Sequence, residues 1–344
     1  MRSLYPVSEI GIFQARNAFL ECPGITAVQG RRKPANRQDS MIRHRFVTIS
    51  KNASNPAYRG ARIGVDRLAR ARGVEVRHLT PVVDDSIPEQ VEMLEKLRQE
   101  RPDAVLISAA HESALDAGLE ALRDAGVVVV MFVGRTKRHD LARCFVGSND
   151  RAMTRAVAEA VAERVGGRGT TLVLDGNPLG ILHEARAAGF REGLARHPGM
   201  KLLGARNGDF LREPARLATE ALLAEHGVPD TMLVANDFMG LGALDALRPR
   251  GARPVMGSVN ATPDGIAAIR RGDMLVSAAF NAMAMGCLAM EAGLRILRGE
   301  TVPDRVLLPA ELVTAENLAA WDLPYEERPL PDWDRTVAAQ NATP

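Results

Sequence analysis

The sequence has few cysteines and almost no excess of one charge, and both shortages exclude broad classes of protein. Its three cysteines, Cys22, Cys144 and Cys287, lie far apart and form no Cys-x-x-Cys pair. An odd number of scattered thiols argues against a scaffold built from disulfides. Lys plus Arg total 44 against 42 Asp plus Glu, a formal net charge of +2. So small an excess gives no field that would draw the protein onto nucleic acid or anionic lipid.

Long hydrophobic runs are also missing. The longest, such as Val127–Val133, fall well short of the ~20 apolar residues that a helix needs to cross a bilayer. Residues 1–45 mix Arg, Glu, Asn, Pro and Gln, and they lack the ~7 to 15 consecutive apolar residues of a secretory signal. We therefore expect residues 1–45 to form a poorly ordered extension, and we expect no direct insertion into a membrane.

Signatures of catalysis and of cofactor binding are absent from the sequence as well. There is no Gly-x-Ser-x-Gly nucleophile elbow, no cysteine in a recognised nucleophile signature, and no Gly-x-Gly-x-x-Gly fingerprint after the first predicted strand. The histidines show neither His-Glu-x-x-His nor any paired metal spacing. We therefore predict that the protein is not an enzyme, with no catalytic residues, no cofactor and no metal site.

Apolar residues make up 46% of the 344 residues, enough for two domains with cores of their own. From Phe46 onward, short β-branched runs alternate with stretches whose apolar residues recur at helical spacing. The alternation restarts after a break near Gly147–Asp150. The predicted strands are 46–50, 74–79, 104–108 and 127–133 in the first unit, and 170–174, 201–204, 231–235, 254–257 and 275–278 in the second.

This alternation predicts an α/β protein with two doubly wound parallel sheets, because parallel neighbours need long crossover connections that helices supply. After the second unit, Ala282–Leu297 predicts a long helix rich in small residues. The segment from Asp322 is rich in proline and charge, and we expect it to carry no fold.

Candidate site residues lie where the predicted strands end, because ligands of open α/β sheets bind beyond the carboxyl ends of the strands. Asparagine recurs at these ends. An amide both donates and accepts hydrogen bonds, as a ligand hydroxyl does, and an aromatic ring can cover the apolar face of a sugar. Aromatic residues are only 4% of the chain, yet Tyr58, Phe210 and Phe280 all lie at such ends. The pattern favours a small hydroxylated ligand.

Five short motifs occur in an order and spacing that resemble a known family. The chain resembles the type I periplasmic sugar-binding proteins of ABC transporters, of the ribose-binding kind, over roughly residues 46–317. The resemblance implies two Rossmann-like lobes, joined by a hinge of three crossings, that close on the ligand and are then recognised by a membrane permease. The motifs are Asn55–Tyr58, Gly147–Asp150, Gly208–Phe210, Asn236–Ala243 and Thr262–Gly265.

The resemblance also implies roles for individual residues. Tyr58 matches a ring-stacking aromatic, Phe210 the aromatic that follows Gly-Asp, and Asn236 the amide that contacts sugar hydroxyls. The ligand-binding residues predicted from the loops and the resemblance together are Asn55, Tyr58, Arg135, Asn149, Glu184, Phe210, Asn236, Asn260, Phe280 and Asn281.

Several positions depart from the family pattern. The acidic residue expected before a helix cap is Asn260, and of an Asp-Arg pair after the fourth strand only Arg135 survives, shifted by one position. An arginine of the pattern falls at Glu184, and a late glutamine falls at Phe280, beside Asn281. These departures argue against ribose itself and leave another sugar, a polyol or another small polar solute.

The resemblance further implies the function and the division of the chain. We expect a solute-binding receptor of an ABC-type importer, with a sugar or polyol as ligand, permease subunits as partners and no nucleic acid. The expected N-terminal lobe is 46–148 plus 281–309 and the C-terminal lobe 149–280 plus 310–325, between the extension 1–45 and a tail 326–344.

One alternative has the same fold, a cytoplasmic sugar-sensing regulatory protein related to the effector domain of lactose-repressor-like regulators. Residues 1–45 show no recognition helix and no base-reading basic surface, which argues against DNA binding. The two functions also differ in location. The resemblance implies the periplasm, although no signal peptide is visible, whereas the cytoplasm is expected if Met1 is the true start.

Overall fold

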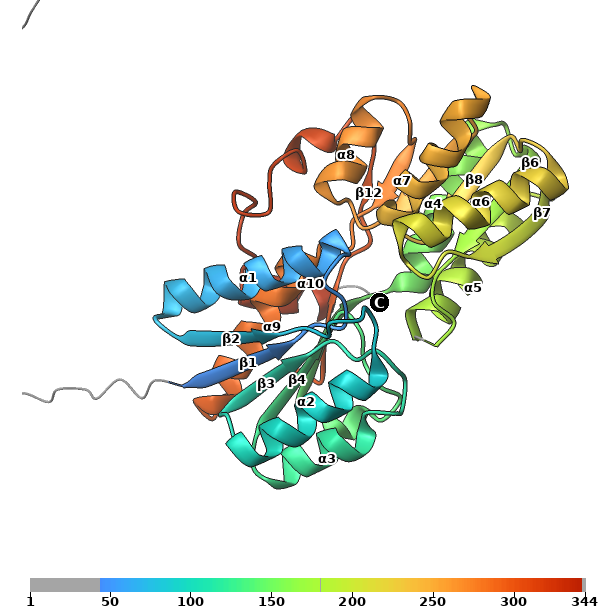
Figure 1. Ribbon diagram of the computed structural model, residues 1–344. Coiled ribbons are helices and arrows are strands. Elements are labelled where there is room, and N and C mark those ends of the chain that lie inside the picture. The colour runs from blue at the N-terminus through green and yellow to red at the C-terminus, as the bar shows by residue number, and fades with distance from the viewer. Residues whose placement is uncertain (1–43, 180, 342–344) are drawn as a thin grey trace, which may run out of the picture. The chain divides into compact units, whose positions relative to one another are not determined.

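The computed structural model describes residues 44–179 and 181–341, and these belong to one compact unit that begins at Arg43. The extension expected over residues 1–45 therefore lies, up to residue 43, outside the described residues. The described chain forms two sheets of six strands each, covered by helices (Figure 1). No helix in this part of the chain is both long and apolar enough to span a membrane.

The first sheet belongs to the N-terminal lobe and has the strand order β11-β5-β4-β3-β1-β2, with every pair parallel. Helices α1 and α9 cover one face and share a core with Phe46 and Leu106, while α2 and α3 cover the other face and pack on Val47 and Ile49 (Figure 1). Its elements are β1 (Arg45–Ile49), α1 (Pro56–Arg72), β2 (Glu75–Leu79), α2 (Ile87–Glu100), β3 (Ala104–Ile107), α3 (Asp116–Asp124), β4 (Val128–Phe132), η1 (His139–Leu141), β5 (Cys144–Ser148), α9 (Ala282–Leu297) and β11 (Arg305–Leu308).

The second sheet has the order β12-β10-β9-β8-β6-β7 and is parallel except for the antiparallel pair of β10 and β12. Helices α4 and α5 pack against each other, and so do α6 and α7. Its elements are α4 (Asp150–Arg164), β6 (Arg168–Asp175), α5 (Ile181–Ala195), β7 (Gly199–Asn207), α6 (Arg212–His226), β8 (Thr231–Val234), α7 (Asp237–Leu247), η2 (Arg248–Arg250), β9 (Val255–Val259), α8 (Pro263–Arg270), β10 (Val276–Ala278), β12 (Leu312–Val313) and η3 (Leu318–Ala320).

The chain passes between the two sheets three times, from β5 into α4, from β10 into α9 and from β11 into β12. The predicted class of two doubly wound α/β lobes joined by three crossings is therefore confirmed. The sequence pattern missed β5, β11 and β12, which are short edge or near-edge strands. Their order depends on hydrogen bonds to strands distant in the chain, and no local pattern carries that information.

The long helix rich in small residues is confirmed as α9, and its glycines explain how closely it packs on α1. A side chain on Gly64 of α1 would collide with the Met283 carbonyl group, and one on Gly286 of α9 would collide with that of Ala61. The two helix backbones therefore touch where larger side chains would hold them apart. This contact anchors α9 to the N-terminal lobe directly after the second crossing.

The expectation that the segment from Asp322 carries no fold is wrong. It contains the helix α10 (Trp333–Asn341), and Tyr325, Arg328 and Trp333 are all buried. Arg328 donates to the carbonyl oxygens of Trp321, Leu323 and Ala261, and Gln340 bonds to the backbone of β11. The few anchoring side chains dock on surfaces that exist only after the lobes have folded, so no periodicity in the segment reveals them.

Candidate functional site

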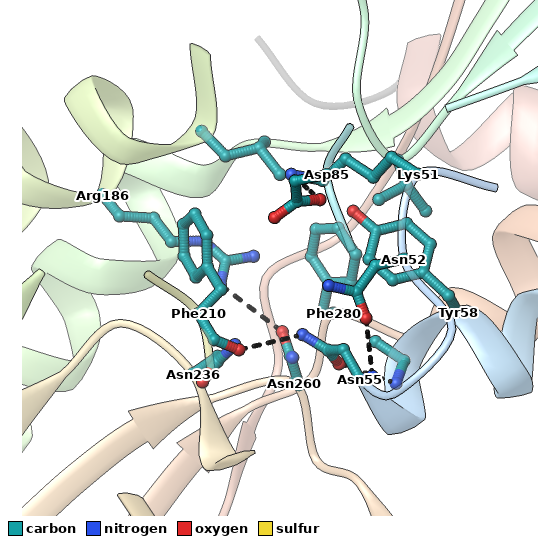
Figure 2. Close-up of a pocket in the computed structure, with 13 residues that line it drawn as sticks. Lys51, Asn52, Asn55, Tyr58, Asp85, Arg186, Phe210, Asn236, Asn260 and Phe280 are labelled. Carbon is teal, nitrogen blue, oxygen red and sulfur yellow. Dashed lines mark hydrogen bonds and ion pairs between the residues drawn. The ribbon is translucent and has the colours of Figure 1, made fainter. Parts of the chain in front are cut away.

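A pocket between the two lobes is lined by loops at the carboxyl ends of strands from both sheets (Figure 2). It encloses about 370 Å³, part of it open to solvent. Six of the ten predicted residues line it, namely Asn55, Tyr58, Phe210, Asn236, Asn260 and Phe280.

The four other predicted residues, Arg135, Asn149, Glu184 and Asn281, do not line this pocket. Asn149 and Asn281 cap the first turns of α4 and α9. Glu184 is exposed on α5, whereas Arg186, two residues further on, faces the pocket. Two residues on a helix correspond to a rotation of about 200°, so these side chains point to opposite sides. Arg135 stacks on the Phe145 ring, 5.2 Å from its centroid, outside the pocket.

The asparagines of the pocket also start helices. The Asn55 Oδ1 atom accepts a hydrogen bond of 3.0 Å from the Ala57 amide, and the Asn236 Oδ1 atom accepts one of 2.8 Å from the Met239 amide. Both are N-caps, one of α1 and one of α7, and such a side chain is among the best residues for that position. Asparagine recurs at the strand ends in part because a helix begins there.

The remaining amide groups of these two residues meet at one oxygen. The carbonyl oxygen of Phe210 accepts from Asn55 Nδ2 at 3.3 Å and from Asn236 Nδ2 at 3.1 Å. Asn55 belongs to the N-terminal lobe, whereas Asn236 and Phe210 belong to the C-terminal lobe. The bond from Asn55 therefore joins the two lobes across the pocket (Figure 2).

Phe210 reaches this position through an unusual backbone. Asp209 and Phe210 have φ values of 53° and 60°, in the left-handed region that side chains rarely adopt. The Phe210 ring lies directly over Gly176, where any side chain would collide with it. Two hydrogen bonds to the Phe210 carbonyl group and the close packing of its ring against Gly176 hold the strained turn in place. The consequence is an aromatic face in the pocket wall.

A buried arginine lies between two aromatic rings at the centre of the pocket wall. The Arg186 guanidinium carbon lies 5.6 Å from the Phe210 ring centroid and 4.9 Å from that of Phe280. Its Nε atom donates to the Asp150 carboxylate at 2.7 Å, and only 2% of the residue is exposed. Sequence reasoning missed Arg186. Its position midway between Leu182 and Phe190, on the apolar stripe of α5, was the available signal.

A second buried ion pair lies in the part of the pocket formed by the N-terminal lobe. The Lys51 Nζ atom is 3.2 Å from Asp85 Oδ1, and Lys51 is only 5% exposed. Burial by itself lowers the pKa of Lys51, but the negative charges of Tyr58 in its ionised form and of Asp85 more than offset this, and the pKa is above its ordinary value. Lys51 is therefore charged at neutral pH. Sequence reasoning missed both residues of this pair.

Two polar groups of this region are available to a ligand. Asp85 Oδ1 is buried without a hydrogen bond among the described residues, although Lys51 lies close to it. Burial raises the pKa of Tyr58, so its phenol is protonated at neutral pH and can both donate and accept. With Lys51 balanced by Asp85 and Arg186 by Asp150, the pocket suits an uncharged group that carries hydroxyls. Among the described residues, no cluster of side chains could hold a metal ion.

Known proteins resemble this chain in sequence. The family model described as a periplasmic binding protein domain matches residues 46–301. A ribose import binding protein of Bacillus subtilis is 26% identical over 261 residues, covering 76% of this chain and 84% of that protein. A xylitol-binding protein of Mycolicibacterium smegmatis is 26% identical over 263 residues, covering 74% of this chain and 73% of that protein.

Two solved structures give the same picture of the fold. The periplasmic solute-binding protein of an ABC transporter from Actinobacillus succinogenes, with bound D-allose, has a TM-score of 0.76 at 19% identity, covering 79% of this chain and 98% of that one. The solute-binding protein of an ABC transporter from Bacillus halodurans, with bound myo-inositol, also has a TM-score of 0.76, at 20% identity, and covers 81% of this chain and 97% of that one. At these identities the likeness concerns the fold.

Proposed function

The chain belongs to the periplasmic binding protein domain family, and from that premise we propose that it is the solute-binding receptor of an ABC-type importer. The resemblance predicted from the five motifs is thereby confirmed. Members of the family are substrate-binding proteins, so the prediction that the chain is not an enzyme is confirmed as well. The ligand is a sugar or polyol whose hydroxylated ring or chain occupies the pocket between the lobes.

The observation that carries this proposal is the combination of groups in the pocket. Tyr58, Phe210 and Phe280 supply aromatic surface, and Asn260, Asp85 and Lys51 supply acceptors and donors at neutral pH. A sugar or polyol presents the matching surfaces, apolar C–H faces and hydroxyls that both donate and accept. Relatives that share the family are described as binding ribose, allose and xylitol.

Capture proceeds by closure of the two lobes. The lining groups come from both lobes, so a ligand gains its full set of contacts only when the lobes are together. The hydrogen bond from Asn55 to the Phe210 carbonyl group forms in the same arrangement. A ligand that contacts both lobes shifts the equilibrium from the open to the closed state. The size of the shift equals the difference between the ligand's binding free energies for the two states.

A thermal-shift screen against pentoses, hexoses, polyols and other small polar solutes tests the proposal. A ligand that binds only the folded protein raises its melting temperature. At a ligand concentration of a hundred times the Kd, the free energy of unfolding increases by about 2.7 kcal/mol. Isothermal titration of each hit, repeated with Tyr58→Ala, should show weaker binding because ring contact is lost. The proposal fails if no sugar or polyol binds, or if Tyr58→Ala binds every hit as tightly as the parent protein.

The alternative of a cytoplasmic regulator is not favoured, because the relatives described above are solute-binding proteins of importers. The periplasm and a permease partner are part of our proposal. Fractionation of native cells with N-terminal sequencing tests the location, and copurification with the membrane subunits of an ABC transporter tests the partner. An intact cytoplasmic form would refute export.

A further inference from the structure

A second hollow adjoins the pocket. Val133 and Leu182 line both of them, so the two spaces are neighbours. The hollow encloses about 720 Å³, part of it open to solvent. Arg135, Phe145 and Arg305 contribute its other wall. A molecule in the pocket that extends past Val133 and Leu182 would enter the hollow that these arginines line.

The two arginines lie on the same face of the first sheet. Arg305 in β11 is the register partner of Phe145 in β5, and neighbours in register point to the same face. Arg135 stacks on the Phe145 ring at 5.2 Å. The ring itself leans over Gly147, toward the end of β5 where the lobes meet. The apolar ring therefore supports one guanidinium group beside the other.

Neither arginine has an acidic partner among the residues that the structure describes. Besides its stacking on the Phe145 ring, Arg135 hydrogen-bonds to the His139 ring, and burial together with the nearby charge of Arg305 lowers the pKa of Arg135. The pKa of His139 is lowered as well, by burial and by both arginines, so the ring is uncharged at neutral pH. Arg135 is half-buried and Arg305 is exposed, and two neighbouring guanidinium groups without a counterion suit the binding of a carboxylate or a phosphate.

The other charges around the hollow are already balanced. Asp150 is bonded to Arg186, and Arg151 is paired with Glu192. The hollow therefore has a net positive charge, whereas the ion pairs of the pocket cancel.

We propose that the ligand carries an anionic group, a phosphate or a carboxylate, which Arg135 and Arg305 bind in this hollow while the hydroxylated part occupies the pocket. This inference rests on the proposed function and narrows it to acidic sugars or polyols. Arginine suits both anions because its planar donors can bind two oxygens at once. Asn149, which also lines the hollow, is placed beside the same group.

Isothermal titration with matched ligand pairs tests the inference. Each pair differs by one anionic group: D-ribose and its terminal phosphate ester, D-glucose and D-glucuronate, D-galactose and D-galacturonate, and myo-inositol and its monophosphate. In at least one pair the anionic member should bind about ten-fold or more tightly, as expected for a charge-assisted contact. This advantage should shrink as ionic strength rises from about 0.01 to 0.15 M, because the hollow is partly open to solvent.

Three variants locate the effect. Arg305→Ala and Arg135→Ala should each abolish the anionic advantage while leaving the affinity for the neutral member within about two-fold. Arg143→Ala is the matched control, because Arg143 lines a neighbouring hollow with both arginines but not this one. Arg305 is exposed, so its truncation leaves the fold intact even if that of Arg135 does not.

The outcomes separate this inference from the function on which it rests. If neutral members bind as tightly as their anionic partners in every pair, the anionic site is refuted and the sugar receptor stands. The site would also be refuted if Arg143→Ala lost as much of the preference for the anionic member as Arg135→Ala and Arg305→Ala do. Diffuse positive charge on the surface would then explain the preference. If no member of any pair binds, both the anionic site and the four tested ligand classes are refuted.

Discussion

The buried pair of Arg186 and Asp150 offers the sharpest test of the site's construction. It joins α5 to α4 with an Nε-to-Oδ1 distance of 2.7 Å, and the two side chains are only 3% and 6% exposed. Asp150→Asn keeps the shape of the side chain but leaves the guanidinium charge without a counterion. Removing one partner of a buried pair costs about 3 to 5 kcal/mol, whereas forming the pair contributes little net stability.

The expected loss is large enough for a simple assay. With about 2.1 cal/mol/K of unfolding entropy per residue, a cost of about 3 kcal/mol lowers the melting temperature of a chain of 344 residues by about 4 °C. Differential scanning calorimetry of the ligand-free protein measures it. The double variant Asp150→Asn with Arg186→Met removes the stranded charge and should recover most of the loss, since a methionine fills the space between Phe210 and Phe280.

The chain supplies a matched control. Arg151 and Glu192 also join α4 to α5, one residue from Asp150, but their side chains are 62% and 32% exposed. Glu192→Gln should leave the melting temperature almost unchanged, because solvent screens an exposed pair. Our reasoning is wrong if Asp150→Asn and Glu192→Gln have equal effects, or if the double variant is no more stable than Asp150→Asn alone.

Three further predictions follow from burial and capping. Asn236→Ala removes the N-cap of α7 and a hydrogen-bond donor to the Phe210 carbonyl oxygen. Chemical denaturation should show a free energy of unfolding lower by about 1 kcal/mol, and titration with a sugar that binds should show a weaker affinity. Unchanged values for both would contradict this role. Burial raises the pKa of the Cys144 and Cys287 thiols to about 12, so in a Cys22→Ala protein a disulfide reagent at pH 8 should modify them only after denaturation. Rapid reaction of that variant in its native state would contradict their burial. Burial also raises the pKa of Asp175 above 3.8, so ionisation of Asp175 favours the unfolded chain. Asp175→Asn should therefore raise the melting temperature at neutral pH, and this gain should disappear as the pH falls below 3.8. A gain that persists below that pH would refute the electrostatic cause.

Local patterns of residues are enough to predict most of the helices and strands and their alternation. Periodic apolar residues identify the long helices, and proline with a capping side chain identifies where α1 and α8 begin, because these signals involve only residues within a turn or two. From the alternation follow two parallel sheets with a site at their carboxyl ends. Tyr58 in the first turn of α1 and Phe210 in the loop after β7 could be placed at that site because both follow closely after a strand.

Which side chains face the pocket, and which charges neutralise them, depends on contacts between segments that are distant in the chain. Glu184 and Arg186 differ by two positions in sequence, but the helix turns them to opposite sides, and only packing of α5 on α4 selects the side that meets the pocket. Lys51 and Asp85 come from loops after different strands, and their pairing requires β1 beside β2. Contacts between distant segments depend on the whole fold, which no local pattern of residues encodes.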